Sequence, residues 1–512
     1  ILAERLEREE DVKNLIEMAQ KLEGMTRNIG MHAGGVVIAP GKLTDFCPLY
    51  QQPGSDSAVS MFDKDDVEQI GLVKFDFLGL AKLTILEIAR EFIQKRHKGQ
   101  ENFKFEDIPL DDWPTYKLFQ EGKTEAVFQF ESRGMQGMLK EARPSRLEDL
   151  IALNALYRPG PMDLIPSFVA RKHGTEVIEY PHQLVEKVLA ETYGIMVYQE
   201  QVMQTAQVLG GYSLGGADLL RRAMGKKKPE EMAQHRLLFR EGAGKKGIPP
   251  EKADEVFDLM EKFAGYGFNK SHAAAYSLLA YHTAWIKVHY TAEFFCGNMT
   301  VEMDNTDKLK VLHEDALKMG LTFEPPDVNR GGYRFEPVTD KVIRYGLGAI
   351  KGSGQAAIEA IIAARNGQGP GPQGHVQGPF KSLWDFCTRV DRAKLNKRTL
   401  EALIKAGAFD SIERNRAALM AATDAAFEFA NAQWANAHQG GLFDMMGDDA
   451  QGASSQAPEL PQTLPWGIKE RLMQEKTAVG FYLSGHLFDE VESEVRQFIR
   501  TPLADLADSR EP

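Results

Sequence analysis

The sequence has few cysteines and no long apolar run. Its three cysteines, Cys47, Cys296 and Cys387, match no metal-ligand spacing, so we expect reduced thiols in a cytoplasmic protein. No stretch approaches the roughly twenty apolar residues of a membrane-spanning helix. The first 25 residues are charged and follow a helical period, which is not typical of a signal peptide. They lack an initiating Met, and we interpret the chain as a piece of a longer protein.

An excess of positive charge is also absent. The 512 residues include 73 acidic and 61 basic ones, for a net charge of −12. This balance argues against nucleic-acid binding by the whole surface, but phosphate contacts need only a local basic patch. With 43% hydrophobic and 26% charged residues the chain is globular, and its length predicts about three or four domains.

The pattern along the chain predicts an α+β fold that is predominantly helical. We expect a helix or helix pair over residues 1–30 and a strand-rich segment over 31–80. A long helical region follows over 81–310, then a glycine-rich and helical region over 311–450. The composition of residues 451–512 predicts a linker and a short helical segment. A small mixed sheet is expected around Asp76.

The segment GLVKFDFLGL, residues 71–80, alternates like a buried strand yet carries two charges. Val73, Phe75 and Phe77 share one face, and Lys74 and Asp76 share the other. One interpretation is an ion pair on the solvent side of an edge strand. The other is that Asp76 ligates Mg²⁺ while Lys74 meets an anion beside it, as in phosphoryl-transfer sites.

A two-metal site needs more carboxylates than Asp76 alone. The segment FDKDD offers Asp63, Asp65 and Asp66, but its composition is typical of a polar turn.

A basic surface is predicted in LLRRAMGKKKPEEM. If residues 219–224 are helical, one stripe is buried, formed by Leu220, Ala223 and Met224. The positive charges are Arg221, Arg222, Lys226, Lys227 and Lys228. Two interpretations are open. These residues form a solvated charged face, or they bind a triphosphate or a phosphate backbone.

A second cluster lies in GYGFNKSHAAAY, where glycines permit a close approach to Tyr266, Phe268, Lys270 and His272. These side chains are either core residues or part of a site. Arg158 in ALYRPGPM sits on a proline-stiffened turn.

The stretch IKGSGQAA resembles a helix-hairpin-helix motif. Gly352 and Gly354 open a helix beside Lys351, and the basic KLNKR precedes a second helix. Backbone N–H groups of such a turn bind phosphate without reading sequence.

The segment QGGLF lies between a helix and the linker. It is either a docking peptide, with Gln439 as polar anchor and Leu442 and Phe443 as apolar pair, or a helix end that packs on its own domain.

Taken together, these blocks resemble the alpha subunits of bacterial DNA polymerase III, the C-family replicative polymerases. The resemblance runs almost from end to end and rests on GMHAGGVVIAP, GLVKFDFLGL, FQFESRGM, LYRPGPM, TYGIMVYQEQVMQTAQVLGGYSLGGADLLRRAMGKKKPEEM, FAGYGFNKSHAAAYSLLAYHTAWIKVHY and GLGAIKGSGQAAIEAI.

The resemblance implies roles for the candidate residues. Asp76 would be one of three palm carboxylates that hold two Mg²⁺ ions, and Lys74 would touch the triphosphate of the incoming deoxynucleotide. Arg221 and Arg222 would be fingers arginines on the same triphosphate, and His272 would sense the sugar. The residues assigned to primer–template DNA are Lys226, Lys227, Lys351, Gly352 and Gly354.

The resemblance also implies regions and partners. Residues 1–30 would end the thumb, 31–80 would be the second part of a nucleotidyltransferase-type palm, and 81–310 the fingers. Residues 311–450 would carry helix-hairpin-helix elements and QGGLF as the sliding-clamp peptide, and 451–512 would lead toward an oligonucleotide-binding fold. Other replicase holoenzyme subunits are further expected partners. Gly440 stands where a bulky apolar residue is usual, and Leu487 where proline is usual.

The family's other two metal-binding aspartates would precede residue 1, so we expect that this chain alone cannot polymerise. One alternative is an error-prone paralogue, against which QGGLF argues. Another is a non-catalytic DNA-binding protein, against which the presence of Asp76, Lys74 and the arginines argues. An exonuclease is disfavoured because Asp, Glu and His do not cluster at metal-ligand spacing in the sequence.

Overall fold

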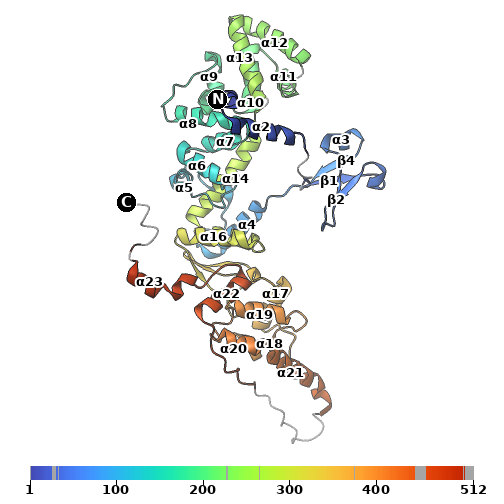
Figure 1. Ribbon diagram of the computed structural model, residues 1–512, viewed down its shortest axis with the longest axis vertical. Helices are drawn as coiled ribbons and strands as arrows, with labels where there is room; N and C mark the ends of the chain where they lie inside the picture. Colours follow the sequence, from blue (N-terminus) through green and yellow to red (C-terminus); the bar gives the residue numbers. More distant parts are fainter. Residues whose placement is uncertain are drawn as a thin grey trace. The chain divides into compact units, whose positions relative to one another are not determined.

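In the computed structural model the chain forms two compact units, residues 1–80 and residues 81–512 (Figure 1). The described residues are 2–25, 30–32, 34–226, 229–264, 266–373, 375–443, 457–499 and 501. In this part of the chain, helices predominate and strands are few and short, which confirms the predicted fold class. None of the described helices has the length and apolar character needed to span a bilayer.

Unit 1, residues 1–80, begins with two helices and continues with short strands, as the sequence pattern predicts. The helices are α1 (Leu2–Arg8), α2 (Glu10–Leu22), the short α3 (Lys64–Gln69) and the 3₁₀ turn η1 (Leu43–Asp45). The strands are β1 (Gly35–Ile38), β2 (Leu49–Gln51), β3 (Ala58–Ser60) and β4 (Val73–Asp76).

The sheet around Asp76 is an antiparallel pair. Strand β1 pairs with β4, so that Val37 lies opposite Lys74 and Gly35 opposite Asp76. Val37 is one of the side chains that pack on a small core of Cys47, Val67 and Leu72. The mixed sheet expected here lies elsewhere: among the described strands, mixed pairing occurs in unit 2, where β5 (Thr322–Glu324) runs parallel and β6 (Glu336–Thr339) antiparallel to β7 (Val342–Arg344).

The apolar face of β4 is exposed within unit 1, although its alternation predicts a buried strand. Val73, Phe75 and Phe77 are all exposed, as are Val36 and Ile38 on the paired strand. The alternating pattern of β4 predicts a buried apolar face, but no described residues of unit 1 cover that face.

The FDKDD segment was expected to be a polar turn, but it opens helix α3. Oδ1 of Asp63 accepts a hydrogen bond from the backbone N–H of Asp66 at 2.9 Å, which satisfies a free N–H group of the first helical turn. Asp is common both as a helix-capping residue and as a metal ligand, so composition alone cannot distinguish these two roles.

The first part of unit 2, residues 81–318, is built from helices. They are α4 (Ala81–Arg96), α5 (Trp113–Gln120), α6 (Arg133–Ala142), α7 (Leu147–Leu156), α8 (Ile165–Lys172), α9 (Glu186–Leu189), α10 (Gln199–Gly210), α11 (Leu214–Lys226), α12 (Pro229–Gly244), α13 (Pro250–Ala264), α14 (Lys270–His289), α15 (Thr291–Val301) and α16 (Thr306–Lys318). Figure 1 shows α14 as a long helix beside α5 and α7, which pack against it. Helix α7 is apolar on nearly all sides and is buried accordingly.

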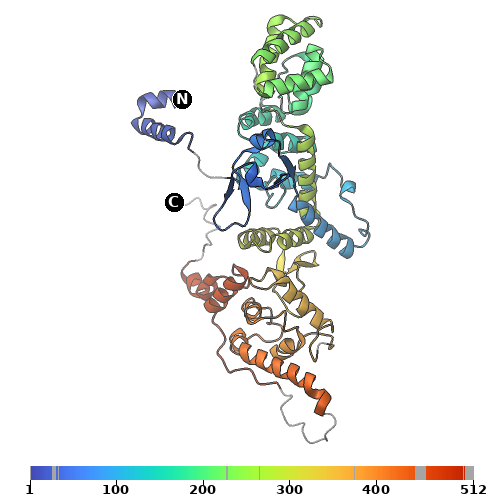
Figure 2. The same cartoon turned by 90° about the vertical axis from the view of Figure 1, so that its right-hand side faces the viewer.

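The second part of unit 2 joins the three-stranded sheet to further helices. These are α17 (Gln355–Arg365), α18 (Leu383–Arg389), α19 (Lys397–Lys405), α20 (Arg416–Ala421), α21 (Thr423–Phe443), α22 (Ile468–Val479) and α23 (Glu492–Phe498). The long orange helix in Figure 2 is α21, which packs against α18.

Helix α22 is fixed to the helices before the linker. It packs against α19, and its Glu475 lies 3.5 Å from Arg416, whose guanidinium also bonds Asp410 at 2.8 and 2.6 Å. Glu475 and Arg416 are both buried. Helix α22 and residues 410–416 therefore share one core, which the composition of residues 451–512 did not indicate.

We predict that the packing around His313 weakens in mild acid. Its ring is buried on α16 against Phe323 and Phe481, and burial lowers its pKa to about 4. The unfolded chain, with a histidine pKa of about 6.5, binds one proton more between these pH values. The free energy of unfolding should thus be retained above about pH 6.5 and fall by up to about 3 kcal/mol toward pH 4.

Urea unfolding followed by circular dichroism checks this at pH 7.5 and pH 5. His313→Leu should show a smaller loss between the two pH values than the wild type. Equal losses in both proteins would contradict the prediction.

Candidate functional site

Lys74 and Asp76 point to the same side of β4, as the strand period predicts. Nζ of Lys74 lies 3.2 Å from Oδ1 of Asp76. Lys74 is mostly covered, whereas half of the Asp76 side chain is exposed, at 50%. The ion pair of the simpler interpretation is therefore present, and it leaves a carboxylate that is open to a ligand.

As a magnesium ligand, Asp76 fits in part. Mg²⁺ prefers carboxylate oxygens and completes its shell with water and substrate phosphates, so one exposed carboxylate is suitable. Within the described residues, the one group of three metal-capable side chains lies elsewhere, at His97, Glu293 and Asp340 in unit 2. Arg96 donates to both of those carboxylates, and its single positive charge offsets one of their two negative charges.

The basic surface on α11 has the predicted stripe. Leu220, Ala223 and Met224 are buried, and Arg221 and Arg222 lie on the outer side. Lys227 and Lys228 are outside the described residues, and for Lys226 only the backbone is described.

One carboxylate, that of Asp218, holds both arginines. Its Oδ1 accepts from Nε and Nη2 of Arg221 at 3.0 and 2.9 Å, and its Oδ2 lies 2.9 Å from Nε of Arg222. These hydrogen bonds, chiefly those from Arg221, lower the pKa of Asp218.

The second predicted cluster, in the segment GYGFNKSHAAAY, is connected to α11 through Gln199. Gln199, the first residue of α10, accepts from Nη1 of Arg221 at 3.4 Å and donates from its amide to the carbonyl of Gly267 at 3.1 Å. Its backbone N–H donates to the carbonyl of Phe268 at 2.9 Å. Arg221 is therefore connected to the segment that leads into His272.

Arg158 reaches the same segment from the proline-stiffened turn. Its guanidinium lies over the ring of Phe268 at 4.4 Å and donates to the carbonyl of Tyr266 at 2.8 Å. His272 is exposed in the first turn of α14, with its ring 5.3 Å from that of Phe268 and 4.3 Å from that of Tyr276. Arginines from two segments and one histidine thus share a surface, which we call the arginine–histidine surface.

Sequence reasoning missed Asp218 and Gln199. The signal for Asp218 was present, because an acid three and four residues before two arginines lies on the same side of a helix. No comparable signal marks Gln199, which meets Arg221 only through the packing of α10 against α11.

The glycine-rich hairpin has the expected form at its second helix. Gly352 has a φ of +87°, which L side chains rarely adopt, and Gly354 precedes α17 without a side-chain cap. The helix before it is only a 3₁₀ turn, η6 (Leu347–Ala349). The first N–H groups of α17 are therefore available for an anion.

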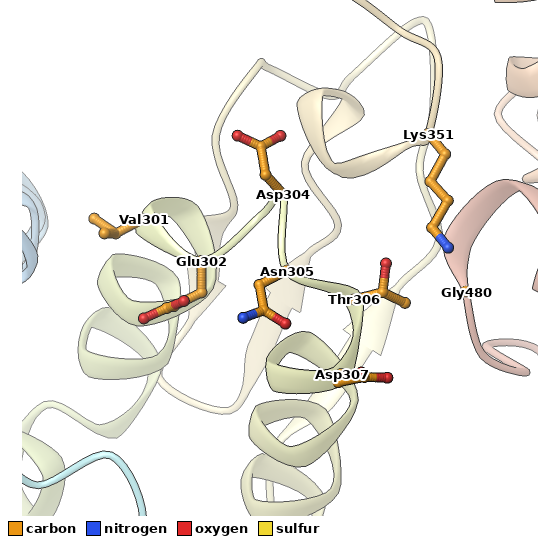
Figure 3. A pocket seen from close by; sticks show the side chains of 8 residues that line it. All are labelled: Val301, Glu302, Asp304, Asn305, Thr306, Asp307, Lys351 and Gly480. Carbon is orange, nitrogen blue, oxygen red and sulfur yellow. The ribbon is translucent and has the colours of Figure 1, made fainter. Parts of the chain in front are cut away.

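Lys351 faces a pocket of about 650 Å³ rather than standing alone on a basic surface. Figure 3 shows its side chain extending toward the backbone at Gly480, with Thr306 and Asp307 on the facing helix. Glu302 and Asp304 also line this pocket. Carboxylates thus partly offset the charge of Lys351.

Arg398, within the basic KLNKR, is closer to the hairpin glycines. A Cβ atom at Gly352 would lie 3.6 Å from its Nε, and the hydroxyl of Thr399 donates to the carbonyl of Gly352 at 3.1 Å. The beginning of α19, capped by Asn396, therefore lies beside the hairpin that leads into α17.

The predicted clamp peptide is described only in part. The backbone of residues 439–443 forms the end of α21, and the side chains of Gln439, Leu442 and Phe443 lie outside what the structure describes.

Comparison with known proteins decides the family. Residues 82–247 match the profile of the bacterial DNA polymerase III alpha subunit finger domain, and residues 1–79 match that of its alpha NTPase domain. Residues 320–419 match a helix-hairpin-helix motif. The chain belongs to the bacterial DNA polymerase III alpha subunit family.

Relatives named DNA polymerase III subunit alpha match almost the whole chain. Identity is 56% over 494 residues with the protein of Neisseria meningitidis serogroup B, covering 96% of this chain and 42% of that one. It is 52% over 505 residues for Xylella fastidiosa Temecula1 (97% and 42%) and 50% over 507 residues for Escherichia coli K12 (97% and 43%). The chain thus spans about 42% of the length of these DNA polymerase III alpha subunits.

Proposed function

We propose that this chain is part of the replicative DNA-directed DNA polymerase. In the reaction, the 3′-oxygen of a primer attacks the α-phosphorus of a deoxynucleoside triphosphate, a new P–O bond forms, and pyrophosphate leaves. The single observation that carries the proposal is the arginine–histidine surface of a chain of this family, where Arg158, Arg221 and His272 are each connected to the segment 266–272.

Asp76 and Lys74 would serve the reacting phosphates from unit 1. The exposed carboxylate of Asp76 would be one ligand of Mg²⁺, which would supply Lewis-acid activation of the primer hydroxyl and neutralise charge on the phosphates. Lys74 lies 3.2 Å from that carboxylate and would add a positive charge for the triphosphate.

The residues of unit 2 would bind the nucleotide and the DNA backbone. Arg221 and Arg222 would hold the triphosphate, because guanidinium groups form paired hydrogen bonds with phosphate oxygens. His272 would contact the sugar from the first turn of α14. Lys226 and Lys227, which follow the arginines in sequence, would contact the phosphate backbone.

The hairpin region would hold primer–template DNA without reading its sequence. The uncapped start of α17 offers N–H groups, and Arg398 adds a charge beside them. Gln439, Leu442 and Phe443 would dock on the sliding clamp, and other replicase subunits would complete the cytoplasmic assembly.

Primer extension tests this proposal. A full-length polymerase carrying this sequence should extend a primed template with four deoxynucleotides and Mg²⁺ and should stop when EDTA is added. Binding to primer–template without extension would instead support the non-catalytic DNA-binding alternative.

We predict that Arg398→Ala weakens DNA binding mainly through the phosphate backbone. Loss of one phosphate contact should reduce the slope of log affinity against log salt by about 0.9, independent of DNA sequence. Fluorescence anisotropy with two unrelated duplexes at several salt concentrations measures both quantities. Lys318→Ala removes an exposed charge at the end of α16 and should leave the slope unchanged; an equal change in both variants would contradict the assignment.

A further inference from the structure

The two arginines of α11 differ in what their guanidinium groups still offer. Arg221 is 24% exposed, and both of its sides are engaged: Nε and Nη2 by Asp218, and Nη1 by Gln199. Arg222 is 64% exposed, and its Nε lies 2.9 Å from Oδ2 of Asp218. Within the described residues, the terminal nitrogens of Arg222 have no protein partner.

This asymmetry follows from one carboxylate at a helical spacing. Residues three and four positions after Asp218 both lie within reach of it, so each of its oxygens takes one guanidinium. Because Oδ2 takes the Nε side of Arg222, the opposite edge, formed by Nη1 and Nη2, stays open. A phosphate can accept two parallel hydrogen bonds from that edge.

Arg221 is held on both sides, so it would meet the triphosphate from a fixed position. Gln199 continues the connection from Arg221 to the carbonyl of Gly267, five residues before His272. The ordinary alternative is a surface ion pair at helical spacing, which contributes little. That alternative does not account for Gln199, which comes from another helix and uses both ends of its amide.

We propose that Asp218 and Gln199 are positioning residues for the nucleotide site. Asp218 turns Arg222 so that its terminal edge meets the triphosphate, and Gln199 with Arg221 ties α11 to the segment before His272. The inference rests on the proposed nucleotidyl transfer and assigns two residues to it that do not themselves touch the nucleotide.

The direction in which Asp218→Ala changes the KM for deoxynucleotide distinguishes two roles of Asp218: positioning Arg222, or competing with phosphates for the arginines. If Asp218 only competed with phosphates for the arginines, removing it would lower the KM for deoxynucleotide. If it positions Arg222, Asp218→Ala should raise that KM by about tenfold, the range expected for one charge-assisted contact. Binding of primer–template should be unchanged, and Asp218→Glu should restore part of the KM.

A double-mutant cycle tests whether Asp218 changes the KM through Arg222. In an Arg222→Ala background, Asp218→Ala should add little to the KM, because its effect passes through Arg222. Gln199→Ala should lower kcat more than it raises KM, since it loosens the segment that carries His272. These measurements use single-nucleotide incorporation by a full-length polymerase carrying this sequence.

Asp254 on α13 is a matched control. Its carboxylate also pairs with two arginines, Arg236 and Arg240 on α12. Asp254→Ala should leave the KM for deoxynucleotide unchanged.

A lowered or unchanged KM for Asp218→Ala, or additive effects in the cycle, would overturn the inference. A wild-type protein that binds primer–template but incorporates no nucleotide would instead overturn the proposed function. The two failures are therefore distinguishable.

Discussion

Asp76→Asn should abolish most primer extension by a full-length polymerase carrying this sequence. The amide is neutral and offers one oxygen, so it would hold Mg²⁺ poorly where phosphate charge must be neutralised. A loss of several kcal/mol of transition-state stabilisation corresponds to a fall in kcat of about a thousandfold. The measurement is single-turnover extension of a labelled primer, with the affinity for primer–template followed in parallel.

The control for this change is Asp56→Asn, which removes an exposed carboxylate from the loop between β2 and β3 and should leave extension intact. Loss of extension with DNA binding retained would place Asp76 at the metal. Unchanged extension would reduce Asp76 to a half-exposed partner of Lys74, an ion pair worth less than about 1 kcal/mol.

Helical periodicity was the most reliable guide in this sequence. The segment 81–310 reads as helical and is helical, and the stripe of Leu220, Ala223 and Met224 is buried as predicted. Such patterns are local, since the side chains that share a helix face are set by 3.6 residues per turn alone. The shared face of Lys74 and Asp76 is local in the same sense, and their ion pair confirms it.

Features that depend on distant segments could not be predicted in this way. The alternation at Val73 and Phe75 predicts burial, but the pattern of a strand cannot identify what would cover its face, and unit 1 leaves this face exposed. The group of His97, Glu293 and Asp340 arises from three segments far apart in sequence, so no spacing could reveal it.

The candidate site shows the same division. Its arginines and histidine were found from local charge patterns, whereas Gln199 joins them through tertiary packing. The i,i+3 and i,i+4 spacing of helices places Asp218 beside both arginines, so a local rule could have predicted this contact. An acidic residue at this spacing thus belongs to a predicted anion site as much as the basic residues do.

Lys287 supports a strained loop near the beginning of unit 2. Its buried ammonium donates to the carbonyls of Lys123 and Glu125 at 3.0 and 2.8 Å and to Oδ2 of Asp315 at 2.8 Å. The next turn of the loop has left-handed backbone at Ala126 and Gln129, with φ of 59° and 64°. Non-glycine residues hold such conformations only where neighbouring groups enforce them. Burial lowers the pKa of Lys287, whereas Asp315 and Glu125 act in the opposite direction and favour the charged form.

Lys287→Met should therefore lower the free energy of unfolding by about 3–5 kcal/mol, because it leaves a carboxylate and two carbonyls without their donor. Urea unfolding followed by circular dichroism measures the loss. The double variant Lys287→Met with Asp315→Leu should recover part of it, since no unpaired charge remains. Lys310→Met, on the exposed side of α16, removes a lysine 3.9 Å from Glu314 and should change the free energy by less than about 1 kcal/mol. A loss as small for Lys287→Met would mean that water can replace the ammonium, and the loop would then have to be held by Lys82, which donates to the carbonyl of Ala126 at 3.0 Å.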